Sequence, residues 1–259
     1  MTGQFTVLIT GTTSGLGRGL LEHYYDRGDR VICVNRRSDA ELESKFPKAV
    51  FKVLDISSRV AVTDLLQELD SKDVKPNLFF LNAGINRPDN TGKNLNFEVF
   101  DEVMRVNFDG TISFVAAAQT LGVRGATFVA ISSMAILSPN IGHLSYFLSK
   151  YGVAKMFYFL RKSDLTNRYK TVVLGPVRTN ITHLYGGPVG WKKKAFSLLA
   201  KTVNQAVPPI TRFAESRRTV LYWPLGTAVA TLFARALISI MAFFGFSSIL
   251  ASSNRKAEI

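Results

Sequence analysis

The sequence contains almost no cysteine and few acidic residues, and both scarcities limit what the protein can be. Its 259 residues include one cysteine, Cys33, so no disulfide can form within the chain. Residues 1–4 run directly into an apolar strand, without the charged region, hydrophobic stretch or cleavage site of a secretory signal. We therefore expect an intracellular protein in a reducing compartment.

Acidic residues number 19 against 32 lysines and arginines, which gives a net charge of +13. This excess favours anionic partners such as nucleotide phosphates, nucleic acid or acidic lipid headgroups. Of that charge, +8 falls in residues 185–259, where ten basic residues stand against two acids. The hydrophobic content of 47% is enough for a full core, which excludes a disordered or fibrous chain.

Apolar runs of strand length alternate with amphipathic stretches of helix length from residue 5 onward. We expect strands at 5–10, 30–35, 49–54, 78–82, 126–132 and 170–174, and a further short strand at 217–223. We expect helices at 15–26, 40–46, 59–69, 97–119, with a bend near Asn107, and 146–162. This order is typical of an α/β fold in which helices cover both faces of a doubly wound parallel sheet. We assign residues 1–224 to this domain and residues 225–259 to an added apolar segment.

The first expected strand ends in a glycine-rich turn that opens a helix. The turn reads Thr10-Gly11-Thr12-Thr13-Ser14-Gly15-Leu16-Gly17. Glycines let the backbone turn tightly and approach a pyrophosphate, which the free N–H groups of the helix N-terminus then hold. The position directly after the first strand favours a dinucleotide site over an ordinary strand-to-helix turn.

The second expected strand ends in Asn35-Arg36-Arg37, where an NAD enzyme would place an acid to bind the ribose hydroxyls. No carboxylate is present there to repel a 2′-phosphate, and the guanidinium of Arg36 matches phosphate oxygens. The sequence therefore predicts NADP(H). The alternative is that both arginines are simply solvated at the end of a strand.

Two further motifs fall at the carboxyl ends of expected strands, where open α/β sheets bind ligands. Asp55-Ile56 follows the third strand, and Asn82-Ala83-Gly84 closes the fourth. Asp55 could accept a hydrogen bond from the adenine amino group, or belong to the N-cap region of the next helix. The Asn-Ala-Gly turn could equally be a plain strand terminus.

A catalytic cluster follows the fifth expected strand. Ser132 and Ser133 end this strand, and Tyr146 and Lys150 lie one turn apart on the next helix. The ammonium of Lys150 is expected to lower the pKa of the Tyr146 phenol toward the range of an acid–base catalyst. Ser133 would hold a carbonyl or alcohol oxygen of the substrate, and Asn107 would seat a water that links Lys150 to solvent.

These motifs, with the Pro-Val-x-Thr run at Pro176–Thr179, resemble the classical short-chain dehydrogenases/reductases over roughly residues 5–182. The resemblance implies a Rossmann-type fold, a nicotinamide cofactor and hydride transfer between the nicotinamide and a carbonyl carbon. It implies a catalytic tetrad of Asn107, Ser133, Tyr146 and Lys150. The cofactor contacts that we expect are Gly11, Thr13, Ser14, Gly15, Leu16, Gly17, Asn35, Arg36, Arg37, Asp55, Ile56, Asn82, Ala83, Gly84, Tyr146, Lys150, Pro176, Val177 and Thr179. We expect no metal site.

Two features depart from the family. The chain has Gly175-Pro176 where the family often has Pro-Gly, and Leu225–Leu250 is an extra segment with a single charge, Arg235. A polar residue recurs there every fourth position, which is typical of a helix lying in a membrane interface. The rivals are a transmembrane span over residues 236–252, which is short for a bilayer, and a helix buried in the core or in a homo-oligomer.

We therefore expect an NADPH-dependent oxidoreductase that interconverts a ketone and a secondary alcohol of a lipophilic substrate. Residues 185–209 are its expected substrate loop, and the tail would attach it as a peripheral or monotopic protein to the cytoplasmic side of a membrane. The alternative is a non-catalytic NADP-sensing or scaffold protein on the same fold. We expect no nucleic-acid partner, since no recognition element is evident.

Overall fold

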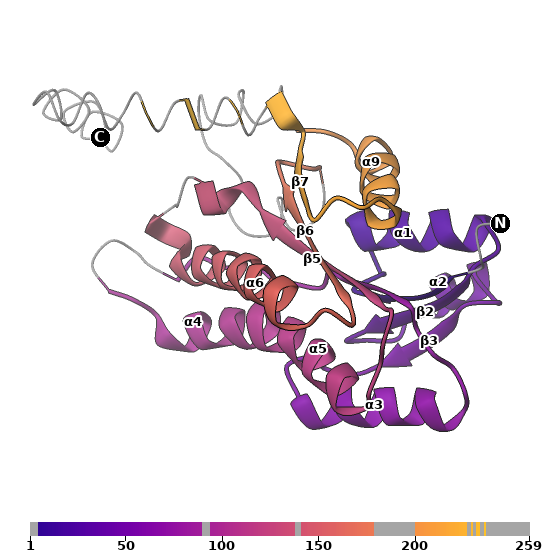
Figure 1. Cartoon of the computed structure of the whole chain (residues 1–259). Helices are drawn as coiled ribbons and strands as arrows, with labels where there is room; N and C mark the ends of the chain where they lie inside the picture. The colour runs from indigo at the N-terminus through magenta and orange to yellow at the C-terminus, as the bar shows by residue number, and fades with distance from the viewer. Residues whose placement is uncertain are drawn as a thin grey trace, which may run out of the picture.

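The computed structural model describes residues 5–89, 94–137, 141–178 and 200–226, together with residues 229, 232, 233 and 236. In this part of the chain, strands form one parallel sheet in the order β3-β2-β1-β4-β5-β6-β7 (Figure 1). The strands are β1 (Thr6–Thr10), β2 (Arg30–Asn35), β3 (Val50–Val53), β4 (Leu78–Leu81), β5 (Thr127–Ser133), β6 (Arg168–Leu174) and β7 (Val220–Trp223). The sheet confirms the expected doubly wound α/β fold.

The central strands are apolar throughout because both faces of the sheet are covered. All four residues of β4 are buried, and β1 buries every residue after Thr6. The strand order reverses between β1 and β4, which both run parallel and lie side by side. In an open α/β sheet, the crevice at the carboxyl ends of such a strand pair is where ligands bind.

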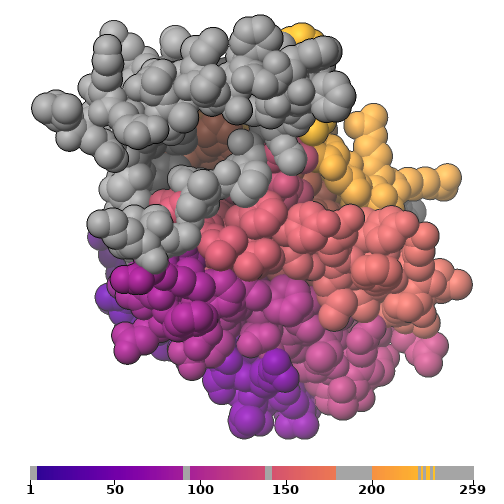
Figure 2. Space-filling model, turned by 90° about the vertical axis from the view of Figure 1, so that its left-hand side faces the viewer, coloured from indigo at the N-terminus to yellow at the C-terminus, as the bar shows by residue number. Residues whose placement is uncertain are grey.

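Helices cover the two faces in separate groups (Figure 1). The α-helices are α1 (Gly15–Asp26), α2 (Ala40–Lys45), α3 (Arg59–Ser71), α4 (Phe97–Met104), α5 (Gly110–Thr120), α6 (Leu144–Ser163) and α9 (Val203–Glu215). Shorter turns are the π-helical η1 (Arg105–Asp109) and the 3-10 segments η2 (Met134–Leu137) and η3 (Ile141–His143). One core cluster joins α1, α2 and α9 to the sheet, and another joins α3, α5 and α6. Figure 2 shows α4 and α6 side by side on the surface of the molecule.

Helix α9 differs from the sequence expectation, which placed residues 203–209 in a substrate loop. It packs on α1 at Gly19, where an added Cβ would lie 2.6 Å from Val203 Cγ1 and 2.8 Å from Val207 Cγ2. A capping box starts the helix: Thr202 Oγ1 accepts from Gln205 N at 3.3 Å, and Gln205 Oε1 accepts from Thr202 N at 3.0 Å. The capping-box residues are a sequence pattern that predicts a helix start, but Pro208 and Pro209 inside the helix predict against a helix.

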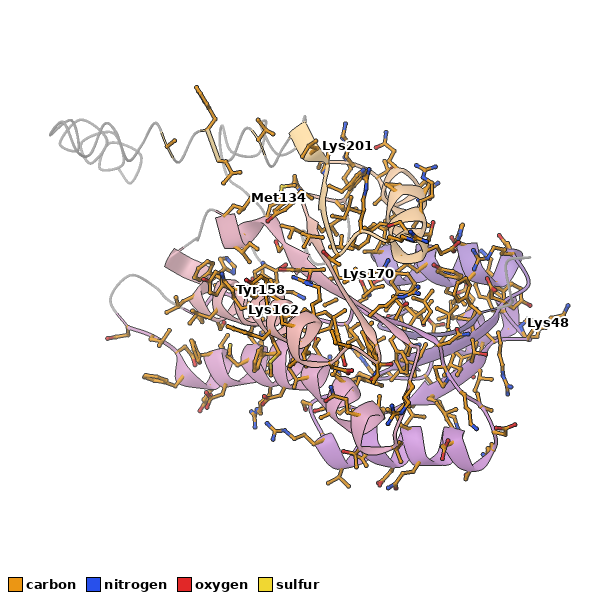
Figure 3. All side chains as sticks on the ribbon, viewed as in Figure 1. Lys48, Met134, Tyr158, Lys162, Lys170 and Lys201 are labelled. Carbon is orange, nitrogen blue, oxygen red and sulfur yellow. The ribbon has the colours of Figure 1, made fainter. Side chains whose placement is uncertain are left out.

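A buried lysine closes the other end of α9. Lys170 in β6 is 2% exposed, and its Nζ donates to Phe213 O at 3.0 Å and to Ser216 O (Figure 3). These carbonyls belong to the last turn of α9, whose negative dipole end favours a cation. Burial lowers the pKa of Lys170 from 10.5 to about 8. Lys170 therefore anchors the helix to the sheet rather than serving the site.

The C-terminal segment 225–250 lies mostly outside the described residues, and so do the lysine cluster at 192–194 and Thr179. The described residues of this segment include Leu225, Val229, Leu232 and Phe233, which are between 49% and 73% exposed. Within the described part of the chain, no helix combines the length and hydropathy needed to cross a bilayer.

Candidate active site

Three glycines shape the turn between β1 and α1. Gly11 and Gly15 have φ of 75° and 59°, a region that side chains rarely adopt. Gly17 has no such φ, but a Cβ there would lie 1.9 Å from Gly11 O. The turn therefore needs glycine at positions 11 and 15 for backbone conformation and at position 17 for close approach of the chain.

The N-terminus of α1 is open toward this turn. Its N-cap, Ser14, makes no side-chain capping hydrogen bond, and its first turn contains no acidic residue. Thr13 and Ser14 are exposed, whereas Leu16 is buried in the core. An uncapped helix N-terminus next to small residues fits a phosphate group, because backbone N–H groups and the helix dipole both favour an anion.

Two asparagines hold the turn from neighbouring strands. Asn35 Oδ1 at the end of β2 accepts from Thr12 N at 2.7 Å and from Thr12 Oγ1 at 3.1 Å. Asn82 Nδ2 after β4 donates to Thr10 O at 3.0 Å and to Gly11 O at 3.1 Å. The Thr10 hydroxyl in turn accepts from the N–H groups of Asn82 and Ala83. Both amides are therefore used inside the protein, where they position the turn.

Arg36 and Arg37 follow Asn35 and are exposed at the end of β2. On the neighbouring strand end, Asp55 Oδ1 accepts from Ser57 N at 2.9 Å. Asp55 is not the N-cap of α3, since Ser58 has that position and accepts from Ala61 N. The adjacent Ile56 is buried and packs on Gly110, where a Cβ would lie 2.9 Å from it.

Asn107 occupies the π-helical turn η1, where sequence analysis expected a bend. Its side chain is fully buried, and Oδ1 accepts from Ile85 N at 2.8 Å. Nδ2 donates to Ile85 O at 2.8 Å and to Ser149 Oγ at 3.1 Å. Single π turns inside helices are frequent at functional sites, and this one turns Asn107 toward α6. Neither Ile85 nor Ser149 was indicated by the sequence.

Asn107 and Lys150 face the same small space beside Gly84. A Cβ on Gly84 would lie 2.9 Å from Asn107 Oδ1 and 3.2 Å from Lys150 Nζ. Lys150 is 6% exposed, and its Nζ donates to Ile131 O at 3.0 Å. The Asn-Ala-Gly turn therefore lies directly against two of the expected catalytic residues.

The two serines at the end of β5 have different surroundings. Ser132 is 2% exposed, and its hydroxyl donates to Lys150 O at 2.9 Å, which ties the strand to α6. Ser133 is only partly buried, and its side chain is hydrogen-bonded to Tyr146. Lys150 Nζ lies 5.9 Å from the centre of the Tyr146 ring. The structure thus brings Ser133, Tyr146 and Lys150 together.

The electrostatics of this cluster differ from the sequence expectation. Burial raises the pKa of Tyr146 above 10, and the hydrogen bond from Ser133 opposes this only in part. The expected lowering of this pKa by Lys150 is therefore wrong for the protein alone. Burial also lowers the pKa of Lys150 from 10.5 to about 8. In both groups, removal from water favours the neutral form.

The segment after β6 lies at the same edge of the sheet. Val177 is buried and forms a parallel bridge with Lys201, whose N–H donates to Pro176 O at 3.0 Å. Gly175 packs against Pro224, where a Cβ would lie 2.9 Å from Pro224 Cδ. The Gly175-Pro176 order is thus accommodated by the turn that follows β7.

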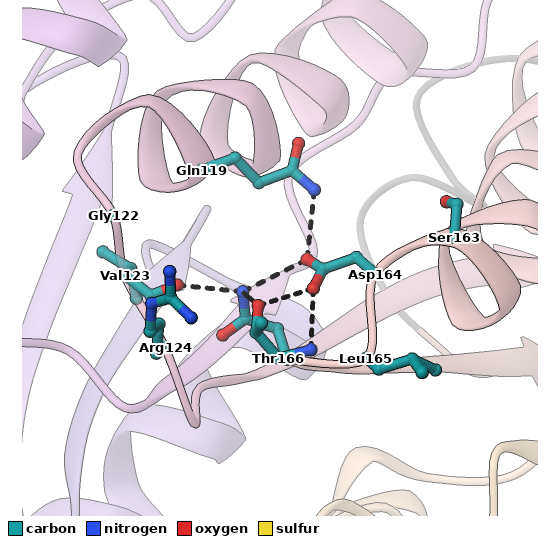
Figure 4. Close-up of a pocket in the computed structure, with 9 residues that line it drawn as sticks. Gln119, Gly122, Val123, Arg124, Ser163, Asp164, Leu165 and Thr166 are labelled. Atoms are coloured by element: carbon teal, nitrogen blue, oxygen red, sulfur yellow. Dashed lines mark hydrogen bonds between the residues drawn. The ribbon is translucent and has the colours of Figure 1, made fainter.

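A surface pocket of 310 Å³ lies at the opposite edge of the sheet, between the segments that precede β5 and β6 (Figure 4). Its centre is Asp164, whose carboxylate accepts hydrogen bonds from the side chains of Gln119, Thr166, Asn167 and Tyr169. These bonds hold the pKa of Asp164 well below its usual range. The carboxylate is satisfied within the protein, so this pocket is a structural junction.

The parallel sheet, its strand order and the glycine turn that opens α1 are those of a Rossmann-type fold. The family model described as short chain dehydrogenase matches residues 5–186. The chain therefore belongs to the short-chain dehydrogenase family.

Individual relatives are more distant. The chain is 30% identical over 154 residues to short-chain dehydrogenase reductase 3c of Arabidopsis thaliana, covering 57% of this chain and 59% of the relative. It is 26% identical over 227 residues to a benzil reductase of Saccharomyces cerevisiae, covering 79% and 86%. The match to the first of these spans about three-fifths of that relative's length.

Solved structures share the fold at low sequence identity. A serine dehydrogenase complexed with NADP+ has a TM-score of 0.73 at 20% identity and covers 83% of this chain and 93% of its own. A short-chain dehydrogenase/reductase from Saccharomyces cerevisiae has a TM-score of 0.75 at 18% identity, with 86% and 96% covered. These structures establish the fold of this chain.

Proposed function

We propose that the protein is an NADPH-dependent oxidoreductase that interconverts a ketone and a secondary alcohol on a lipophilic substrate. The observation that carries this proposal is the cluster of Ser133, Tyr146 and Lys150, with Asn107 beside it, at the edge of the sheet where α1 opens. Acid–base residues and an anion-binding helix end meet at one strand switch point, which is the arrangement that dinucleotide chemistry needs.

In the reduction, bound NADPH would supply a hydride to the carbonyl carbon of the substrate. The Ser133 hydroxyl would donate a hydrogen bond to the carbonyl oxygen, and Tyr146 would donate its phenolic proton to the same oxygen. One hydride and one proton convert the ketone to an alcohol. The raised pKa of Tyr146 keeps its phenol protonated, which is the state that reduction uses.

Lys150 has a supporting role in this scheme. Its pKa of about 8 leaves the amine largely protonated at neutral pH, near the Tyr146 ring. The positive charge stabilises the phenolate that remains after Tyr146 has given up its proton. Asn107 fixes the loop against which Lys150 packs, through its two bonds to Ile85.

The NADP(H) preference is supported by Arg36 and Arg37, which are exposed at the end of β2. Asn35 replaces the acid that would repel a 2′-phosphate, and its amide oxygen is already occupied by Thr12. Among the structural neighbours, a serine dehydrogenase and a Burkholderia cenocepacia enzyme are complexes with NADP, whereas a Brucella melitensis reductase is a complex with NADH.

The lipophilic substrate and the membrane association are supported by the start of the C-terminal segment. Strand β7 is parallel to β6, so residue 225 follows at the carboxyl edge of the sheet, where Ser133 lies. Exposed Leu225, Val229, Leu232 and Phe233 have the i, i+4, i+7, i+8 spacing of one helix face. Such a face would bind the surface of a membrane on its cytoplasmic side and admit an apolar ketone from it.

The tail is tested by truncation after Pro224. We expect the full chain to sediment with vesicles that contain acidic lipid and the truncated chain to stay in solution. If the truncated chain unfolds or dissociates from a homo-oligomer instead, the segment is a core or interface helix. That result would overturn the membrane proposal.

The chemistry is tested by following the oxidation of NADPH with benzil as the ketone substrate, since the yeast relative is a benzil reductase. Tyr146→Phe removes the proton donor and should abolish turnover while NADPH binding persists. Tyr151→Phe is the matched control, since it removes the hydroxyl of an exposed tyrosine five residues further along α6 and should keep wild-type turnover. Wild-type turnover in Tyr146→Phe would refute the catalytic assignment.

Absence of turnover in the wild type, with benzil and with a panel of longer-chain ketones, has a different meaning when NADPH still binds. That result would favour a non-catalytic NADP-sensing protein over an enzyme.

A further inference from the structure

The helix that carries Tyr146 and Lys150 lacks a cap of its own. Helix α6 begins at Leu144, so Tyr146 lies in its first turn, where backbone N–H groups have no partner inside the helix. The N-cap residue is His143, whose side chain makes no capping hydrogen bond, and the first turn contains no acidic residue. The position of Tyr146 therefore depends on whatever holds this helix end.

Asp89 holds it from another part of the chain. Its Oδ1 accepts from Leu144 N at 2.8 Å, and its Oδ2 accepts from Ser145 N at 2.5 Å. Asp89 is 1% exposed, and its backbone N–H donates to Gly142 O at 3.0 Å. A buried carboxylate that accepts two N–H bonds at a helix N-terminus is favoured by both the charge-assisted bonds and the dipole.

Asp89 is the last residue of a strap, residues 85–89, that crosses from η1 to α6. The strap starts at Ile85, whose N–H and C=O are both bonded to the Asn107 side chain. Asn86 Oδ1 lies 2.8 Å from His143 Nδ1. Arg87 forms an ion pair with Glu102 of α4. Four of the five residues of the strap are anchored, so the strap links Asn107 to the start of α6.

We propose that Asp89 is a positioning residue, which sets the place of the Tyr146 hydroxyl relative to Ser133 through the N–H groups of Leu144 and Ser145. The role in turnover rests on the proposed function, but the positioning does not. Asp89 touches neither Tyr146 nor Lys150 in the bonds above, so it acts through the backbone of α6. A catalytic group that is displaced by about 1 Å can lose ~100-fold in rate.

The first test needs no substrate. Tyrosines labelled with ¹³C at Cζ report the surroundings of each phenol, and Tyr146→Phe identifies the Tyr146 resonance by its loss. We expect Asp89→Ala to displace this resonance and change its titration midpoint, because the hydrogen bond to Ser133 is altered. Asp89→Asn keeps one acceptor oxygen and should cause a smaller displacement, which also covers the case in which Asp89→Ala does not fold.

The matched control is Asp39→Ala, which removes an aspartate cap from α2 on the other face of the sheet. It should lower stability without moving the Tyr146 resonance. If Asp89→Ala and Asp89→Asn both leave the resonance and its midpoint at their wild-type values, the proposal is overturned.

The second test uses the benzil assay. We expect Asp89→Ala to lower kcat by about 10- to 100-fold with little change in the Kd of NADPH, with Asp89→Asn between it and the wild type. Equal losses of kcat in Asp89→Ala and Asp39→Ala would overturn a specific positioning role. Lack of turnover in the wild type would count against the proposed function alone, since the resonance test of Asp89 would still stand.

Discussion

Replacing Gly84 by alanine tests the packing at the centre of the site. The new methyl group would lie 2.9 Å from Asn107 Oδ1, about 0.5 Å closer than an ordinary contact of 3.4 Å. Asn107 cannot easily move, because three hydrogen bonds of 2.8 to 3.1 Å hold its side chain. Overpacking of this kind costs about 1–3 kcal/mol, and each kcal/mol lowers the melting temperature by about 2–4 °C in a chain of this size.

The effect on activity should exceed the effect on stability. The same methyl group would lie 3.2 Å from Lys150 Nζ, so it pushes on both groups that support Tyr146. We expect kcat in the benzil assay to fall by about 10- to 100-fold, and calorimetry to give the loss of stability. Gly226→Ala is the matched control, because no atom of the described residues lies within 4 Å of a Cβ there. Wild-type kcat and melting temperature in Gly84→Ala would refute the arrangement of Asn107, Gly84 and Lys150.

Three further predictions concern the cofactor and the fold. Arg36→Ala should lower kcat/KM for NADPH, by an amount that corresponds to about 1.5–3 kcal/mol of lost charge-assisted bonding, and leave kcat/KM for NADH unaffected. Arg30→Ala, at the far end of β2, should change kcat/KM for neither cofactor. Gly19→Ala should lower the free energy of unfolding by up to about 2 kcal/mol in chemical denaturation, since its methyl group meets two valines of α9, and a second change, Val203→Ala, should restore part of the loss. Lys170 has a folded pKa of about 8 against 10.5 when unfolded, so the unfolded chain binds more protons between these values. Between pH 8 and 10.5, the free energy of unfolding of the wild type should therefore rise relative to that of Lys170→Met, whereas below pH 8 the difference between the two should stay constant. A constant difference over the whole pH range would contradict the burial of this amine.

Much of the fold and the chemistry could be predicted because the signals are local in sequence. The expected strands agree with the structure to within a few residues, since strands buried on both faces are continuous apolar runs. The glycine turn and the Tyr146–Lys150 pair are motifs within a single turn or helix. Their residue types are required by backbone geometry and by helix periodicity, which a sequence displays directly.

The remaining features depend on contacts between distant residues. Helix α9 is stabilised by packing on Gly19, which lies 184 positions before Val203, and its two prolines conceal it. The pKa shift of Tyr146 was predicted with the wrong sign, because a sequence displays the charge of the neighbouring Lys150 but not the burial of the phenol. The role of Asp89 depends on N–H groups 55 and 56 residues away.

Side-chain amides hold the loops at the carboxyl edge of the sheet. Hydrogen-bonded strand ladders end there, so each loop needs other partners for its backbone groups. Asn35 supplies them to Thr12, Asn82 to Thr10 and Gly11, and Asn107 to Ile85. The Asn107 amide both accepts from Ile85 N and donates to Ile85 O, which a carboxylate cannot do. An aspartate at position 82 or 107 would remove the amide donor from Thr10 O and Gly11 O or from Ile85 O, so these two asparagines are required by the loops they hold.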